Sequence, residues 1–168
     1  SDNMELEIAN YLNNVSEGRL SSESKLEIRG MLREVTEIES IGDSCYNLAR
    51  TVNRKRTGGN DFTEKQYEHI HQMMQLTENA LKHMVAIVED DAHVVDVNHS
   101  FNIENEMNNY RSQLKNQNIL DVNNKEYDYQ MGVHYMDLIG ECEKLGDYVV
   151  NVVEARTNVK EKKTNENR

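Results

Sequence analysis

The chain has 168 residues, enough for one domain with a sizeable core or for one domain built from two similar halves. It carries 19 Lys and Arg against 30 Asp and Glu, and a net charge of −11 disfavours nucleic acid and anionic membranes as partners. The absence of Pro favours long uninterrupted helices over β-rich folds, which need frequent turn residues. Cys45 and Cys142 lack the spacing of a zinc site or a disulfide framework, which predicts reduced thiols in a cytosolic setting.

Apolar residues at helical spacing predict two helices in the first third of the chain. The first runs from about residue 4 to 16, through Leu6, Ile8, Tyr11, Leu12 and Val15. Ser21 or Ser22 can cap a second helix that extends to about residue 54. At about 1.5 Å per residue, this helix is about 50 Å long, which predicts an elongated bundle. Its apolar stripe, expected to be core, is Ile28, Met31, Leu32, Val35, Ile38, Ile41, Cys45, Leu48 and Val52.

Three more helices follow a break at residues 56–61. Asp61 or Thr63 caps the third helix, which runs through the apolar positions from Ile70 to Val88. The pattern blurs at residues 94–100, which predicts a kink or short turn before a fourth helix at about 102–117. Residues 121–124 are expected to form a loop, and a fifth helix occupies about 125–159.

A near-copy inside the chain is the most informative feature of the sequence. Residues 37–47 align with residues 141–151 at a constant offset of 104, and the two Glu, the Gly, the Asp and the Asn of the segment are identical. Apolar positions also match apolar positions, as Ile41 matches Leu145. These coincidences predict a duplicated helical unit. The two motif helices should then be related by an approximate two-fold axis and pack through Ile41, Cys45, Leu145 and Val149.

The repeated motif places two carboxylates and an amide along one side of a helix. Glu39, Asp43 and Asn47 stand at i, i+4 and i+8, on a face that borders the apolar stripe. Like charges four residues apart repel, and unpaired charges near an interior are costly, so the arrangement favours a cation between them. The Gly before the Asp leaves room for a neighbouring helix. The second copy has the same arrangement, formed by Glu143, Gly146, Asp147 and Asn151.

The runs Glu39-Ser40-Ile41-Gly42-Asp43 and Glu143-Lys144-Leu145-Gly146-Asp147 resemble the ExxxD signature of the PhoU-like phosphate-uptake regulators. The resemblance covers nearly the whole chain. It implies an all-α, elongated antiparallel helical bundle of two three-helix repeats, the first truncated at its N-terminus. Repeat one is expected at about 4–56 and repeat two at about 62–160, with a frayed tail at 161–168.

The same resemblance implies acidic metal sites. In that family a second acidic pair on the first helix of each repeat faces the ExxxD motif. In repeat two the matching stretch begins with Glu104, and Asn108 occupies the position of the second acid. In repeat one only Asp2 remains of the corresponding acidic pair. Oxygen donors of this kind suit iron, manganese or magnesium better than a structural zinc site, although zinc also occurs in the family. The implied binding is weak and stronger at the second motif, with Glu39, Asp43, Asn47, Glu104, Asn108, Glu143, Asp147 and Asn151 as the ligand set.

Within the family, the stretch from Glu104 to Leu114, with Arg111, resembles the cytoplasmic C-terminal domains of bacterial sodium/phosphate cotransporters. The resemblance implies a regulatory or accessory domain of sodium-coupled phosphate transport that acts by protein contact at the cytoplasmic face of the inner membrane. Its expected partner is the membrane portion of the same polypeptide or another transport component, with a homodimer as a further option. The abrupt helical start is expected of a segment excised from a longer chain, and no segment reaches the about 18 apolar residues of a membrane span.

Two other functions stay open at this stage. One is a ferritin-like di-metal enzyme that uses the single Glu-x-x-His pair, Glu68 and His71, although such sites need two of these pairs. The other is a helical scaffold that dimerises and binds no metal. The sequence shows no nucleophile–base pair and no phosphate-binding Gly-rich loop, so an enzyme is not expected.

Overall fold

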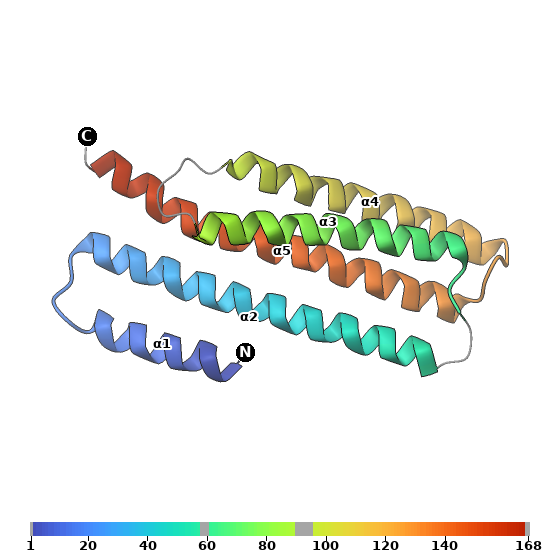
Figure 1. Ribbon diagram of the computed structural model, residues 1–168, viewed down its shortest axis with the longest axis horizontal. Coiled ribbons are helices and arrows are strands. Elements are labelled where there is room, and N and C mark those ends of the chain that lie inside the picture. Colours follow the sequence, from blue (N-terminus) through green and yellow to red (C-terminus); the bar gives the residue numbers. More distant parts are fainter. Residues whose placement is uncertain (1, 58–60, 90–95, 167–168) are drawn as a thin grey trace.

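The structure, a computed structural model, describes residues 2–57, 61–89 and 96–166, and the side chains within 2–55, 61–89 and 96–157. The described residues form an elongated all-α bundle, as the sequence predicts (Figure 1). Its helices are α1 (Asp2–Ser16), α2 (Ser22–Thr57), α3 (Glu64–Glu89), α4 (Val97–Asn123) and α5 (Tyr129–Glu166).

Helices α1 and α2 form a hairpin, and α3, α4 and α5 form a three-helix bundle. The two parts meet along the contact between α2 and α5, which is called the seam below. Helices α3, α4 and α5 pack against one another, and α2 lies antiparallel along α5 (Figure 1). Within the described ranges, α1 packs against α2 alone and α2 packs against α1 and α5. The two motif helices, α2 and α5, therefore pack together as the repeat predicts.

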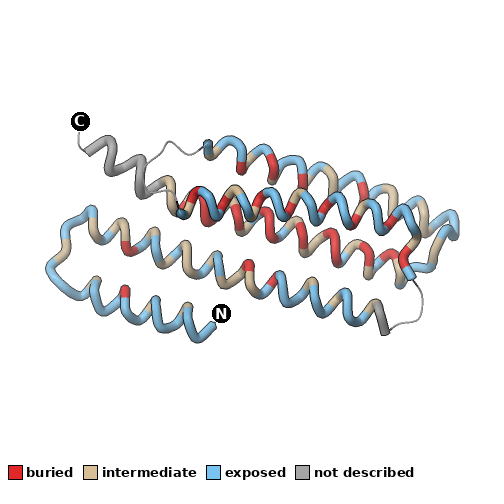
Figure 2. The backbone as a smooth tube through the Cα atoms, in the orientation of Figure 1, coloured by how far each residue is buried: buried red, intermediate tan, exposed pale blue. Residues whose placement is uncertain are grey.

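The core is centred on α5, because this helix is in contact with α2, α3 and α4. Ile139, Val152 and Val153 of α5 are fully buried, as are Met73 of α3 and Met107 of α4. Figure 2 shows the buried positions concentrated on α3, α4 and α5, with few on the hairpin of α1 and α2.

The prediction that the apolar stripe of the second helix is core is wrong for most of its residues, and the apolar residues of the first helix are mostly exposed as well. Only Leu12 is buried on α1, and only Ile28 and Ile41 among the stripe residues of α2. Cys45, expected in the seam between the motif helices, is exposed. The reason is that, among the described helices, α1 packs against α2 alone and α2 packs against α1 and α5 alone, which leaves one face of the hairpin uncovered, whereas α5 packs against α2, α3 and α4.

Local hydrogen bonds explain where two of the helices begin. The amide of Gln66 donates to Thr63 Oγ1 at 3.2 Å, and the amide of Thr63 donates to Gln66 Oε1 at 3.0 Å, which is a reciprocal capping box at the start of α3. At the start of α2, Ser21 Oγ accepts the amide of Ser24 at 3.1 Å. Thr63 and Ser21 are thus the caps among the predicted candidates.

Some predicted boundaries need correction. Helix α4 begins at Val97 and continues through the predicted loop to Asn123, and the chain turns at residues 124–128, where Lys125 has a φ of 61°. Helix α5 continues to Glu166, so most of the predicted frayed tail is helical. The predicted break at 56–61 and kink at 94–100 lie partly outside the described residues. No described helix combines the length and apolar character needed to span a bilayer.

Candidate functional site

The first motif forms a cluster of three carboxylates from two helices. Asp2 of α1 lies beside Glu39 and Asp43 of α2, with one ligand oxygen of each within 4.8 Å of the others. The hairpin turn brings the start of α1 back to the middle of α2, and Thr36 Oγ1 donates to Glu5 Oε1 at 3.0 Å one turn further along. Asp2 and Asp43 are exposed and Glu39 is half-buried. Hard oxygen ligands in a solvent-accessible position fit a divalent cation such as Mg²⁺ or Mn²⁺.

The second motif gathers the same kinds of side chain around an arginine. Glu143 and Asp147 of α5 face Glu104 of α4, and Arg111 Nε lies 3.6 Å from Glu143 Oε2. Asn108 donates its amide to Glu104 Oε1, one turn before Arg111 on the same helix. Arg111 therefore supplies a positive charge where the sequence pattern favours a cation.

The electrostatics of this cluster depend on burial and on the neighbouring carboxylates. Burial raises the pKa of Glu143, the negative charges of Asp147 and Glu104 raise it further, and the Arg111 guanidinium opposes the shift. Burial also raises the pKa of Asp147, again opposed by Arg111. A fourth acid at the position of Asn108 would add to this repulsion, so the neutral amide fits a cluster that holds one arginine.

The asparagines of the two motifs face the seam between α2 and α5. Asn151 donates to Glu37 Oε2 at 3.0 Å and accepts from Arg33 at 3.4 Å. Each step of four residues advances the helix face by about 40°, so the i+8 residue points about 80° away from the i residue. The three polar side chains of a motif therefore do not stack on one helix face as expected. The side-chain amide of Asn151 instead contacts Glu37 and Arg33 of α2.

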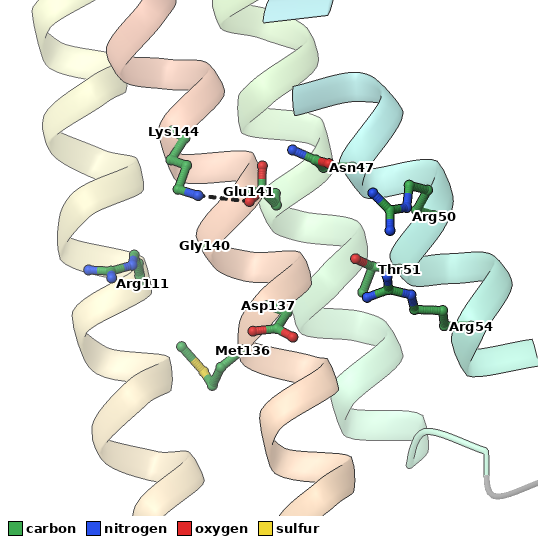
Figure 3. A pocket seen from close by; sticks show the side chains of 10 residues that line it. All are labelled: Asn47, Arg50, Thr51, Arg54, Arg111, Met136, Asp137, Gly140, Glu141 and Lys144. Carbon is green, nitrogen blue, oxygen red and sulfur yellow. Dashed lines mark hydrogen bonds and ion pairs between the residues drawn. The ribbon is translucent and has the colours of Figure 1, made fainter. Parts of the chain in front are cut away.

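A pocket of about 470 Å³ opens at the other end of the same seam (Figure 3). No motif in the sequence predicts this pocket, although the internal repeat carries a signal for it. Arg33 and Glu154, which form an ion pair at 3.0 Å, align at the 104-residue offset with Asp137 and Arg50 of the pocket. Lys144 Nζ lies 2.8 Å from Glu141 Oε1 (Figure 3). The lining residues are Asn47, Arg50, Thr51, Arg54, Arg111, Met136, Asp137, Gly140, Glu141 and Lys144.

Gly146 has the role that the sequence predicts for the glycine of the motif. A Cβ built on it would lie 3.0 Å from Met107 Sδ, so the missing side chain lets α4 approach α5 closely. This approach brings Glu104 of α4 within range of Glu143 of α5.

The Glu-x-x-His pair joins no metal-ligand cluster within the described residues. Glu68 and His71 are both exposed on α3, and the group of Asp2, Glu39 and Asp43 is the converging set of metal-ligand side chains among the described residues. His69 lies instead beside Tyr135, with Nδ1 2.9 Å from the phenol oxygen, and burial lowers the pKa of His69. His71 is therefore a surface residue, and the ring of His69 has a hydrogen-bond partner in Tyr135.

A comparison with protein families matches residues 70–155 to the PhoU domain, which is just over half of the chain. The matched segment extends from α3 through α4 to Ala155 of α5, so it includes the second acidic motif. Comparisons with curated proteins and with solved structures give no match.

Proposed function

This chain belongs to the PhoU domain family, and from that premise we propose that it is a regulatory domain of sodium-coupled phosphate transport that acts by protein contact. PhoU domains regulate phosphate homeostasis. The family match carries the regulatory part of the proposal, and the Glu104–Leu114 stretch with its Arg111 supports the link to a sodium/phosphate cotransporter. The proposed partner is the membrane portion of such a transporter, at the cytoplasmic face of the inner membrane.

Two properties of the surface support action by contact. The chain is acidic, with a net charge of −11, which favours basic protein segments over phosphate-rich surfaces as partners. Nine of the sixteen large apolar side chains that are exposed in the described part of the chain lie on α1 and α2. Exposed apolar residues gathered on one element are typical of a protein contact surface.

A transport assay tests the regulatory proposal. A bacterial sodium/phosphate cotransporter is reconstituted in vesicles with its cytoplasmic face outward, and sodium-dependent phosphate uptake is measured with and without this chain. We expect the uptake rate to change at saturating chain and the chain to sediment with transporter vesicles but not with empty ones. Unchanged uptake together with no co-sedimentation would refute the proposal.

We further propose that a divalent cation binds weakly at the first motif in preference to the second, which is the reverse of the order that the family resemblance implies. Asp2, Glu39 and Asp43 bring three carboxylates together, a donor set that fits a hard cation. At the second motif Arg111 already neutralises part of the acidic charge, and Asn108 replaces an acid. The donor set there fits an internal ion pair better than a metal.

Calorimetric titration with Mn²⁺ tests this preference with a matched pair of variants. Asp43→Asn and Asp147→Asn each remove one charge from the aspartate position of an ExxxD motif, and circular dichroism checks that both are folded. We expect the binding heat to disappear in Asp43→Asn and to persist in Asp147→Asn. Equal isotherms for the wild type and Asp43→Asn would exclude the first motif as the binding site.

A further inference from the structure

The internal repeat makes the two ends of the seam equivalent, so one end can be compared with the other. At the offset of 104 residues, Asn47 aligns with Asn151, and Glu37 aligns with Glu141. Because the offset exchanges α2 with α5, the pair of Asn151 and Glu37 at one end corresponds to the pair of Asn47 and Glu141 at the other. The first end is called the closed end below, and the second, where the pocket of about 470 Å³ lies, is called the open end.

At the closed end the polar side chains satisfy one another. Asn151 donates to Glu37 Oε2 at 3.0 Å. Arg33 donates to Asn151 Oδ1 at 3.4 Å and forms the ion pair with Glu154 at 3.0 Å. Each of these four residues therefore has a partner on the opposite helix of the seam.

At the open end the equivalent side chains stay apart. Within the described residues, Glu141 Oε2 is buried without a hydrogen-bond partner, so Asn47 does not make the corresponding contact. The counterpart of the ion pair, Arg50 with Asp137, is not formed in the part of the chain that the structure describes. Arg50 lies instead over the Tyr46 ring, 5.7 Å from its centroid. A buried carboxylate oxygen without a partner is costly, so this end favours a ligand that donates a hydrogen bond.

Gly140 of α5 lies within the open end (Figure 3). A Cβ built on it would meet no neighbouring atom within 4 Å outside its own helical turn, so no packed helix requires a glycine here. Glycine is less stable than alanine in a helix interior, and one of its uses is to let a ligand approach the backbone. At the closed end the equivalent residue is Thr36, whose side chain contacts Glu5 of α1. The open end therefore has free space above α5 that the closed end lacks.

The open end is also basic, although the whole chain carries a net charge of −11. Four basic and two acidic side chains line it, namely Arg50, Arg54, Arg111, Lys144, Asp137 and Glu141. Arg50 and Arg54 stand four residues apart on one face of α2 with Thr51 beside them, and Figure 3 shows this face directed toward α5. Guanidinium groups and hydroxyls are donors that proteins use to bind oxyanions.

We propose that the open end binds inorganic phosphate as hydrogen phosphate. The guanidinium groups of Arg50 and Arg54 would donate to its unprotonated oxygens, and its protonated oxygen would donate to Glu141 Oε2. The negative charge of this ion suits the excess of basic side chains, and its proton suits the buried carboxylate oxygen, which would repel an anion without one. Binding rests on the pocket alone, whereas a role of bound phosphate as a signal rests on the proposed function in phosphate transport.

The carboxylate of Glu141 makes the proposal specific for one oxyanion. Sulfate carries no proton at neutral pH, and a phosphate monoester loses its last proton at about pH 6, so neither can donate to Glu141 at pH 8. Inorganic phosphate keeps one proton at that pH. We therefore expect it to bind about tenfold more tightly than sulfate or phosphoserine, which corresponds to one charge-assisted hydrogen bond.

A nuclear magnetic resonance titration of the wild-type chain with sodium phosphate tests the proposal, at pH 8 and constant ionic strength. We expect saturable shifts of the backbone amides at 47–54 and 137–144, and about tenfold higher concentrations of sodium sulfate or phosphoserine for the same shifts. No saturable shift with phosphate overturns the proposal. Equal binding of sulfate also overturns it, and tighter binding of phosphoserine would assign the pocket to a phosphorylated protein segment instead.

Three variants locate the site. Arg50→Gln removes a positive charge from the open end, and Arg29→Gln, the matched control, removes one from the exposed surface of the same helix outside the pocket. Gly140→Leu fills the opening and should leave the helical spectrum unchanged, because its Cβ meets open space. We expect Arg50→Gln to weaken phosphate binding about tenfold, Gly140→Leu to abolish it and Arg29→Gln to leave it unchanged. Equal affinities of the two arginine variants would overturn the assignment to this pocket.

Glu141→Gln tests the acceptor of the phosphate proton. A glutamine amide can donate to sulfate, so the ratio of phosphate affinity to sulfate affinity should fall from about ten to about one. An unchanged ratio would overturn the role of Glu141. All these titrations use this chain alone, so a negative result leaves the transport assay of the proposed function unaffected, and unchanged transport leaves the phosphate site standing.

Discussion

Replacing Arg111 by Met tests whether this side chain acts as the internal cation of the second motif. Met keeps most of the apolar stem of the side chain and removes only the charged group. Glu143, Asp147 and Glu104 would then lack the positive charge that opposes their mutual repulsion. We expect a loss of stability at neutral pH.

The size of the loss follows from the geometry of the pair. At 3.6 Å and an effective dielectric constant of about 20, the Coulomb attraction between Arg111 and Glu143 is about 4–5 kcal/mol. The Arg111 side chain is 39% exposed, so solvent screening and desolvation reduce the net contribution to about 1–2 kcal/mol. For a chain of this size that corresponds to a decrease in melting temperature of about 2–8 °C.

The dependence on pH separates this mechanism from a simple packing defect. Burial raises the folded-state pKa values of Glu143 and Asp147, and loss of Arg111 raises them further, so the folded state binds protons more readily than the unfolded state. Its stability therefore falls as pH rises through these pKa values and recovers as pH falls from 7 towards about 5.

Thermal unfolding at pH 7 and pH 5 measures both effects, with Lys115→Met as the control that removes a positive charge from the exposed side of α4 one turn away. We expect the difference between wild type and the Arg111 variant to shrink at pH 5, and millimolar Mn²⁺ to restore part of the stability at pH 7. A loss that is equal at both pH values, or equal to that of the control, would refute the role of Arg111.

Three further outcomes are expected from local geometry. Gly146→Ala should lower the free energy of unfolding by about 1 kcal/mol in urea unfolding. The new Cβ meets the fully buried Met107, and this crowding outweighs the better helix propensity of Ala. A rise in stability would show that Met107 adapts. Thr63→Ala should cost about 1 kcal/mol in the same assay through loss of the cap of α3, and no change would exclude that role. Under native conditions at pH 8 a thiol reagent should modify the exposed Cys45 and spare Cys142, since burial raises the Cys142 pKa to about 11, and equal rates would contradict the burial of Cys142.

Sequence patterns predicted the helical class, Thr63 as one of two candidate caps of the third helix, and the packing of the two motif helices against each other. These features are local or repeated: apolar spacing identifies a helix, a capping box lies within four residues, and the 104-residue offset relates two segments without any knowledge of the fold. The sequence could not determine whether an apolar stripe is covered. Met31 and Tyr135 occupy equivalent positions, yet one is exposed and the other is buried by α3.

Tertiary packing alone decided the character of the two acidic motifs. Both read as Glu-x-x-x-Asp, but the fold of α1 brings Asp2 to the first, and the contact of α4 with α5 brings Arg111 to the second. A charge pattern specifies which groups share a helix face, whereas the charge that faces them comes from another helix at a distance set by packing. The same sequence motif is therefore a candidate cation site in one half of the molecule and an internal ion pair in the other.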